Sequence, residues 1–310
     1  MTVINMLSLG ESGIAVADEQ SSSFIRKYNV AQKLQLFDDK VVYGGSGPAD
    51  IIREIYEQSK REIQELKKER GSLQLKDIYE IVSKVAINHK NQFKNRILYS
   101  NLGITLDDYI TGTLSRNGQK LDEHVKAYAG NAIQKIDEEW HVAALLGGFE
   151  LNGDSQKFSI YGVDARGFSF KISRPYGTIG SGADESDKVL SSYIANLKRD
   201  KREKIAPHEG LAKIIEATNA SARLNVGVGG TFSIVYINPH EVIIPSEDNC
   251  ILATEVVQGL THALLDKDLA YNMLERLIFK QEDFEVVEEE LKTGTKDWKL
   301  LDRFLRGYKE

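Results

Sequence analysis

The sequence predicts an α+β protein, because strand patterns and helix patterns occupy separate stretches of its 310 residues. Short apolar segments with glycine-rich turns fill the first 47 residues, and helical periodicity begins at Ile51. A second group of strand patterns starts at Val142 with an Asn152-Gly153 hairpin signal, and helical patterns follow Gly182. We expect a single enlarged domain over residues 1–310.

Strands open the chain. Residues 2–9 and 13–18 read as two short strands, and a further extended segment begins at Ser21. Residues 34–37 and 41–43 form a predicted hairpin that leads into Gly44-Gly45-Ser46-Gly47. We expect these glycines to make a tight turn with free backbone N–H groups before the first helix.

Two helices are expected next. Pro48 suits a first helical turn capped by Ser46 or Gly47, and apolar residues recur at helical spacing up to Gly71. A second helix fits residues 77–98, with Phe93 among its inward-facing residues. Residues 99–139 are polar and mostly helical, and we interpret them as a helical insertion that forms a lid or an oligomer contact.

The second half repeats the order of strands followed by helices. Four strand patterns predict an antiparallel meander, two helices follow it, and a last hairpin precedes a helical C-terminal extension over residues 249–310. The strands are expected at 142–149, 157–163, 168–172 and 176–179, the helices at 184–198 and 209–222, and the hairpin at 231–237 and 241–244.

Composition argues against several classes of function. A formal net charge of −6 without a basic stripe disfavours a nucleic-acid partner, and no apolar run reaches the ~20 residues that span a bilayer. The single cysteine, Cys250, excludes an internal disulfide and favours a cytoplasmic location, with the thiol buried in its apolar run. The six histidines lack metal-ligand spacing, so we expect neither a metal nor a cofactor.

Thr2 is the candidate nucleophile. Initiator methionine is normally trimmed before a small residue, which would leave a hydroxyl and a free amine on Thr2. An α-amine has a reference pKa of roughly 7.7 to 8.0 and can accept the hydroxyl proton. Lys33 near the amine would favour its neutral form, and Asp18 would hold that lysine in place. Taken singly, Asp18 could be a turn residue and Lys33 a surface lysine.

These residues carry a family resemblance. The opening of the chain resembles that of a proteasome β-type subunit of the N-terminal-nucleophile (Ntn) hydrolase superfamily, in which a Thr, an Asp, a Lys and a Gly-Ser turn follow in this order. Thr2, Asp18, Lys33 and Gly45-Ser46 stand at nearly the family spacing. Later segments match in order as well, namely 145–148, 163–167, 178–182 and 228–235.

The resemblance implies a four-layer αββα sandwich, with residues 48–98 in a helix layer, and it assigns further roles. Gly45 would donate its N–H to the oxyanion, and Ser181 would support the Thr2 amine, although a helix N-cap is an equal alternative for Ser181. Asn225 stands where family members place an Asp, and Val228 where they place a Ser. The implied substrate-binding residues are Tyr43, at the floor of the specificity pocket, and Ser22, Val30 and Ala31, at its walls.

The expected function is therefore hydrolysis of peptide amide bonds through an acyl-enzyme on Thr2, with transpeptidation if an amine replaces water. A peptide or protein substrate and a homo-oligomer, possible as a ring, are implied. A catalytically inactive scaffold or assembly protein is the alternative, favoured by Asn225 and Val228. A third interpretation is an amidohydrolase for a small amide, if residues 99–139 seal the pocket.

Overall fold

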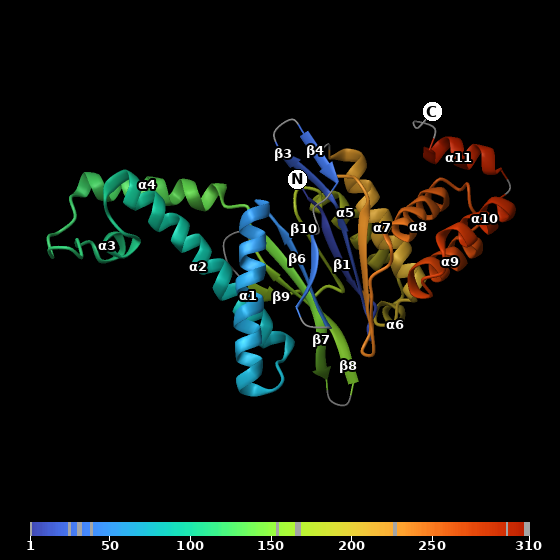
Figure 1. Cartoon of the computed structure of the whole chain (residues 1–310), viewed down its shortest axis with the longest axis horizontal. Helices are drawn as coiled ribbons and strands as arrows, with labels where there is room; N and C mark the ends of the chain where they lie inside the picture. Colours follow the sequence, from blue (N-terminus) through green and yellow to red (C-terminus); the bar gives the residue numbers. More distant parts are fainter. Residues whose placement is uncertain are drawn as a thin grey trace. The chain divides into compact units, whose positions relative to one another are not determined.

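A computed structural model describes residues 2–23, 26–29, 33–37, 40–152, 155–164, 169–225, 228–295 and 297–306. Within these residues the chain is an α+β protein with two five-stranded antiparallel sheets, eleven α-helices and one π-helical segment. It divides into two compact units (Figure 1). The first unit contains residues 1–46, 144–162 and 170–310, and the second contains 47–143 and 163–169.

The first sheet of the first unit contains the N-terminal strand in its interior. Its strand order is β10-β1-β2-β11-β12. Ile4 of β1 pairs with Ala17 of β2 and with Ile179 of β10, both in antiparallel register. The two opening strands and the last hairpin are confirmed. The strands are β1 (Ile4–Ser8), β2 (Gly13–Asp18), β10 (Tyr176–Ile179), β11 (Phe232–Ile237) and β12 (Val242–Ile243).

The second sheet has the order β5-β6-β7-β8-β9, and β3 pairs with β4 in a separate ribbon. The expected meander is right for its first three strands and wrong for the fourth, because β10 lies in the first sheet beside β1. Alternation of apolar residues identifies a strand but not its partner. The strands are β3 (Gln20–Ser23), β4 (Arg26–Asn29), β5 (Leu34–Phe37), β6 (Val41–Ser46), β7 (Ala143–Asn152), β8 (Ser155–Val163) and β9 (Ser169–Lys171).

The two sheets pack face to face through one apolar cluster. Ile4 and Met6 of β1 meet Leu145 of β7 and Phe158 of β8 in this cluster. A Cβ atom at Gly13 or at Gly147 would collide with the Phe158 ring. The aromatic ring therefore fits only because glycines face it from both sheets.

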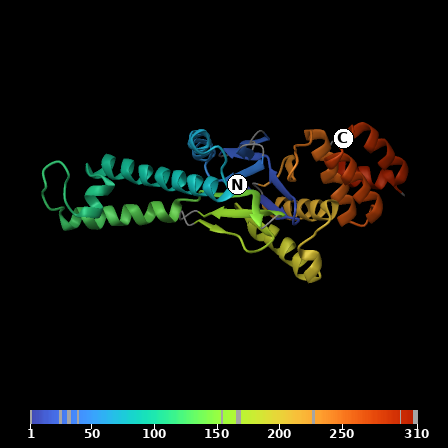
Figure 2. The same ribbon diagram turned by 90° about the horizontal axis from the view of Figure 1, so that it is seen from below.

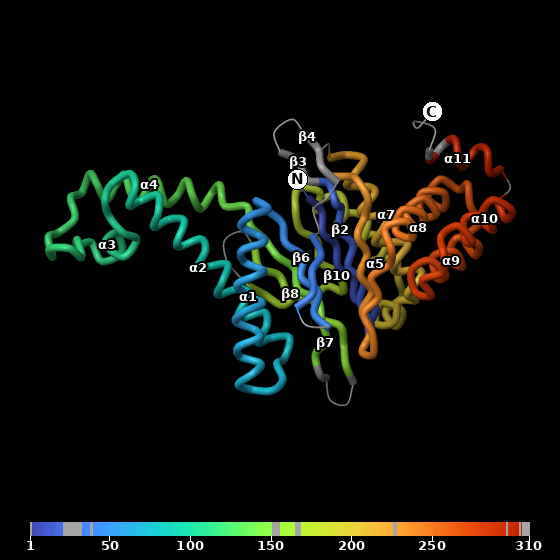
Figure 3. Tube along the Cα trace, in the orientation of Figure 1, coloured from blue at the N-terminus to red at the C-terminus, as the bar shows by residue number. Residues whose placement is uncertain are grey.

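Helices cover the opposite face of the first sheet (Figures 1 and 3). Leu7, Ile14 and Val16 point to that face, and they pack in a second apolar cluster with residues of the helices. The first unit thus has three layers, two of strands and one of helices. The helices of this unit are α5 (Ala183–Asn196), α6 (Arg199–Arg202), α7 (Pro207–Leu224), α8 (Glu247–Thr261), α9 (Lys267–Leu274), α10 (Phe284–Gly294) and α11 (Trp298–Arg306).

The C-terminal helices include a π-helical segment, η2 (Glu275–Phe279), which directly follows α9. Asn249 of α8 donates from Nδ2 to the carbonyl of Leu277 at 2.8 Å and to that of Glu282 at 3.0 Å. These bonds use backbone acceptors that the widened turn exposes. The expected helical character of residues 249–310 holds over the described part.

The second unit is helical. It contains α1 (Ala49–Arg70), α2 (Leu75–Leu102), α3 (Leu106–Thr111) and α4 (Glu123–Glu139), so the expected insertion at 99–139 corresponds to the end of α2 with α3 and α4. Helices α2 and α4 run side by side and share an apolar cluster that includes Leu98 and Ala129 (Figure 2).

Two details of the second unit differ from expectation. The residue before α1 is Pro48 itself, so neither Ser46 nor Gly47 caps that helix. Phe93 does not face inward: its side chain is 40% exposed, and its ring lies 5.8 Å from that of Trp140. A partly covered aromatic ring satisfies helical periodicity as well as a core residue does, which explains the error.

No helix within the described ranges combines the length and the apolar character that crossing a membrane requires.

Cys250 offers a test of the helical layer. It is 3% exposed, and burial raises the pKa of its thiol to about 12. We expect no reaction with the thiol reagent DTNB at pH 8 in the folded protein and complete reaction in guanidinium chloride, because the thiolate is the nucleophile. Absorbance of the released thiol measures the reaction. Rapid modification of the folded protein would contradict this packing.

Candidate active site

Thr2 lies two residues before Ile4, the first residue of β1, and is 8% exposed. Its backbone nitrogen donates to Ser181 Oγ at 3.2 Å, and its carbonyl accepts from Gly182 N at 3.2 Å. A Cβ atom at Gly180 would collide with this carbonyl and would lie 3.2 Å from Ser46 Oγ. Residues 180–182 therefore hold the backbone of Thr2, and the end of β6 lies close to it.

Asp18, the last residue of β2, joins three segments of the chain. Its Oδ1 accepts from the backbone N–H of Val3 at 2.8 Å and from Lys33 Nζ at 2.8 Å. Its Oδ2 accepts from the N–H of Gly229 at 3.3 Å. The sequence predicts Asp18 and Lys33 as a pair beside Thr2. In the structure Asp18 contacts Val3, the residue that follows Thr2.

The pair is deeply buried, with side chains 9% exposed for Lys33 and 0% for Asp18. Lys33 Nζ also donates to the carbonyl of Gln20 at 2.7 Å. Burial raises the pKa of the Asp18 carboxyl despite the opposing effect of Lys33, and burial likewise lowers the pKa of the Lys33 ammonium. Each charge is therefore tolerated only because the other is present.

Ser181 lies beside the backbone nitrogen of Thr2. Helix α5 is preceded by Gly182, which makes no side-chain cap, so Ser181 is not the residue at its N-cap. Its hydroxyl lies against the backbone of Thr2 and accepts the hydrogen bond from that nitrogen. The helix-capping alternative for Ser181 is thus not what the structure has.

The amide of Asn225 bonds to the backbone of the helix that precedes it. Its Nδ2 donates to the carbonyl of Ser221 at 3.2 Å, and its backbone nitrogen donates to the same carbonyl at 2.9 Å. Asn225 ends helix α7, and its side chain satisfies a carbonyl of the last turn. An amide after a helix commonly serves the backbone, which a spacing argument overlooks.

The glycine-rich stretch is more extended than expected. Gly44 and Gly45 belong to strand β6, and only Gly47, with φ of 143°, leaves the extended conformation. Gly45 is therefore the residue before the last one of a strand rather than part of a tight turn. Strand β6 begins in the apolar run 41–43 and continues through Gly44 and Gly45. Because glycine has no side chain, these residues show no alternating pattern, and the sequence did not indicate that the strand extends this far.

The substrate-pocket residues have mixed outcomes. Tyr43 is 1% exposed and packs edge-to-face with Phe37, with ring centroids 5.2 Å apart, so it is a core residue and does not floor an open pocket. Ser22 belongs to β3, and its side chain lies outside the described residues, as do Val30 and Ala31. In an alternating strand pattern, a large side chain such as that of Tyr43 is as compatible with a core position as with a pocket floor.

Three residues of the site were missed from the sequence. Gly229 donates to Asp18, Gln20 provides a carbonyl to Lys33, and Ser221 donates from Oγ to the carbonyl of Gly182 at 2.5 Å. Ser221 Oγ also lies 2.8 Å from Ser186 Oγ, in a buried polar network. The glycine-rich stretch around Gly229 was a sequence signal that could have indicated its role. Gln20 acts through its backbone carbonyl, and a backbone contact leaves no signal in the sequence.

Within the described ranges, no group of three or more His, Cys, Asp or Glu side chains is arranged to hold a metal ion. Comparison of the sequence with models of known protein families gives no match, and comparison with curated proteins gives none. The assignment of a chemistry to this site therefore depends on its own geometry.

Lys33→Met tests the buried pair. The variant leaves Asp18 without its cation, and we expect the free energy of unfolding at pH 8 to fall by about 3 kcal/mol. The pKa of Asp18 should rise further, so the loss should shrink as pH decreases toward that pKa and the carboxyl is protonated. Urea unfolding at pH 8 and pH 5 measures both effects.

Two controls accompany this test. Adding Asp18→Asn to Lys33→Met should recover part of the loss, because the amide oxygen still accepts from Val3 and carries no charge. Lys188→Met, which removes the exposed partner of Glu185, should change stability by less than about 1 kcal/mol. Equal losses in Lys33→Met and Lys188→Met would show that the buried pair has no special role.

Proposed function

We propose that the chain is an N-terminal threonine hydrolase that cleaves peptide amide bonds through an acyl-enzyme on Thr2. The observation that carries the proposal is the contact set of Asp18, whose Oδ1 binds both the N–H of Val3 and Lys33 Nζ. The acid–base pair of Asp18 and Lys33 thus contacts the residue next to Thr2. The nitrogen of Thr2 itself donates to the Ser181 hydroxyl. A peptide or protein is the proposed substrate.

The fold supports this proposal in part. Two face-to-face sheets with helices on one outer face would supply three of the layers of the proposed αββα sandwich. The complete four-layer sandwich belongs to the proposal, and α1 and α2, at 22 and 28 residues, are long enough to form its remaining layer.

The proposed chemistry begins with removal of Met1, which frees the amine of Thr2. That amine takes the proton of Oγ1 as the oxygen attacks the substrate carbonyl, and the nearby Lys33 ammonium keeps the amine neutral near pH 8. The N–H of Gly45 is the proposed donor to the oxyanion. The Thr2 ammonium then protonates the leaving amine, and water cleaves the resulting ester. A second amine in place of water would give transpeptidation.

One observation favours the alternative of an inactive scaffold. Asn225 carries no negative charge where the resemblance implies an acidic residue, and its Nδ2 donates to the carbonyl of Ser221. The two functions differ in whether Thr2 becomes a free, reactive terminus.

Intact mass spectrometry and labelling with a hydroxyl-reactive β-lactone separate these functions. We expect the purified protein to lack Met1 and to gain one lactone adduct, located at Thr2 by peptide mapping. Thr2→Ala should abolish the adduct, whereas Thr113→Ala, at an exposed threonine, should retain it. Complete retention of Met1 without labelling would support the scaffold.

Ser181→Ala tests the support of the amine. Loss of one neutral hydrogen bond is worth about 1 kcal/mol, so the rate of lactone acylation should fall roughly fivefold. Ser100→Ala, at an exposed serine of α2 whose Oγ donates to the helix carbonyl of Ile97, is the matched control and should leave the rate unchanged. Equal rates for Ser181→Ala and the unmodified protein would remove Ser181 from the site.

A further inference from the structure

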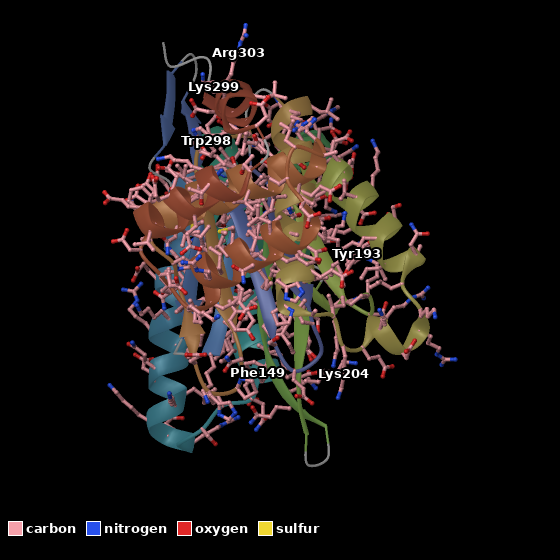
Figure 4. All side chains as sticks on the ribbon, turned by 90° about the vertical axis from the view of Figure 1, so that its right-hand side faces the viewer. Phe149, Tyr193, Lys204, Trp298, Lys299 and Arg303 are labelled. Atoms are coloured by element: carbon pink, nitrogen blue, oxygen red, sulfur yellow. The ribbon has the colours of Figure 1, made fainter. Side chains whose placement is uncertain are left out.

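A cavity of about 740 Å³ opens at the end of the first unit opposite to Thr2. Ser8, the last residue of β1, and Gly10, which follows the strand, line it together with residues of β8, of the β9–β10 connection and of α6. In Figure 4, Phe149 of β7 and Lys204, which follows Glu203 of the lining, both lie at the lower end of the view. The volume is within the range of small-molecule sites.

The floor of the cavity is apolar. Phe158 and Ile160 of β8 are covered core residues at 2% exposed, so the apolar side chains open to the cavity are those of the half-buried Ile172 and of Ile194. These residues belong to the edges of the core, so they are held in place by packing. An apolar ligand body would therefore meet a preformed surface.

The rim carries an excess of positive charge. Four cationic side chains line the cavity, and two of these are neutralised by carboxylates, Lys171 by Glu150 and Arg174 by Asp187. Lys157 and Arg202 have no carboxylate partner within the described residues, and they face one acidic residue without a partner, Glu203. The balance leaves one positive charge in a chain whose formal net charge is −6.

Both arginines are held with donors to spare. Arg202 donates from Nε to the carbonyl of Leu197 at 3.0 Å and from Nη2 to that of Ala195 at 3.1 Å, so its Nη1 has no partner in the described part of the chain. Arg174 lies over the Tyr176 ring, 4.6 Å from its centroid, and uses only Nη1 in hydrogen bonds to described residues. Fixed guanidinium groups bind carboxylates at a low entropic cost.

We propose that this cavity binds an organic monoanion, a carboxylate with an apolar body. The carboxylate would lie at the rim between Arg202, Arg174 and Lys157, and the apolar body would rest on Ile172 and Ile194. The site is separate from Thr2, because Ser8 and the start of β1 lie at opposite ends of one strand. The inference goes beyond the proposed hydrolase and does not depend on it.

Titration with 3-phenylpropionate, followed by ligand-observed NMR and calorimetry, tests the proposal. We expect saturable binding at one site, and about tenfold weaker binding of the neutral 3-phenylpropionamide, which removes the charge and keeps the shape. Thr2→Ala should bind 3-phenylpropionate as the unmodified protein does, so failure here is distinguishable from failure of the hydrolase. Equal affinity for acid and amide, or no saturation, would overturn the proposal.

Variants locate the site. Arg202→Gln should weaken binding of 3-phenylpropionate about tenfold, and Lys157→Gln about threefold. Lys157 makes no contact with other described side chains that folding could require, so its variant keeps the test valid if Arg202→Gln unfolds. Arg116→Gln, an exposed position in the second unit, makes the same charge change and should leave affinity unchanged. An equal effect of all three variants would contradict a site in this cavity.

Discussion

The buried ion pair between Asp18 and Lys33 is the constraint on which the arrangement around Thr2 depends. The Asp18 carboxylate accepts hydrogen bonds from Val3, Lys33 and Gly229, which lie far apart in the sequence. Because the site is buried, removing any of these donors leaves the charge of Asp18, or the polarity of its remaining partners, uncompensated. The segments are thereby held together by electrostatics as well as by strand pairing.

The first sheet supplies the rigid base for this arrangement. Strand β1 has apolar contacts on both faces, since Ile4 and Met6 pack between the sheets and Leu7 packs under the helices. Asn5, on the helix face, is satisfied by donating to Ser186 at 3.0 Å and to Thr218 at 2.9 Å. A residue at the start of such a strand has little freedom, which is what a positioned nucleophile requires.

Much of the secondary structure could be predicted from the sequence, because alternation and helical spacing are local signals. The strands of β1 and β2, the helices α1 and α7, and the pair of Asp18 with Lys33 belong to this class. The partner of β10 could not be predicted, since pairing with β1 depends on where a long chain returns. Tyr43 was misassigned because core packing uses the same residue types as substrate recognition.

The position of β1 between β2 and β10 also sets an order of events during synthesis. Strand β1 and its neighbour β2 are translated early, yet its other neighbour, β10, and the β11 strand that pairs with β2 follow only after the whole second sheet. Closure of these non-local pairs is slow compared with local folding. Thr2, which contacts Ser181 and Gly182 directly after β10, is therefore fixed in place only late in folding.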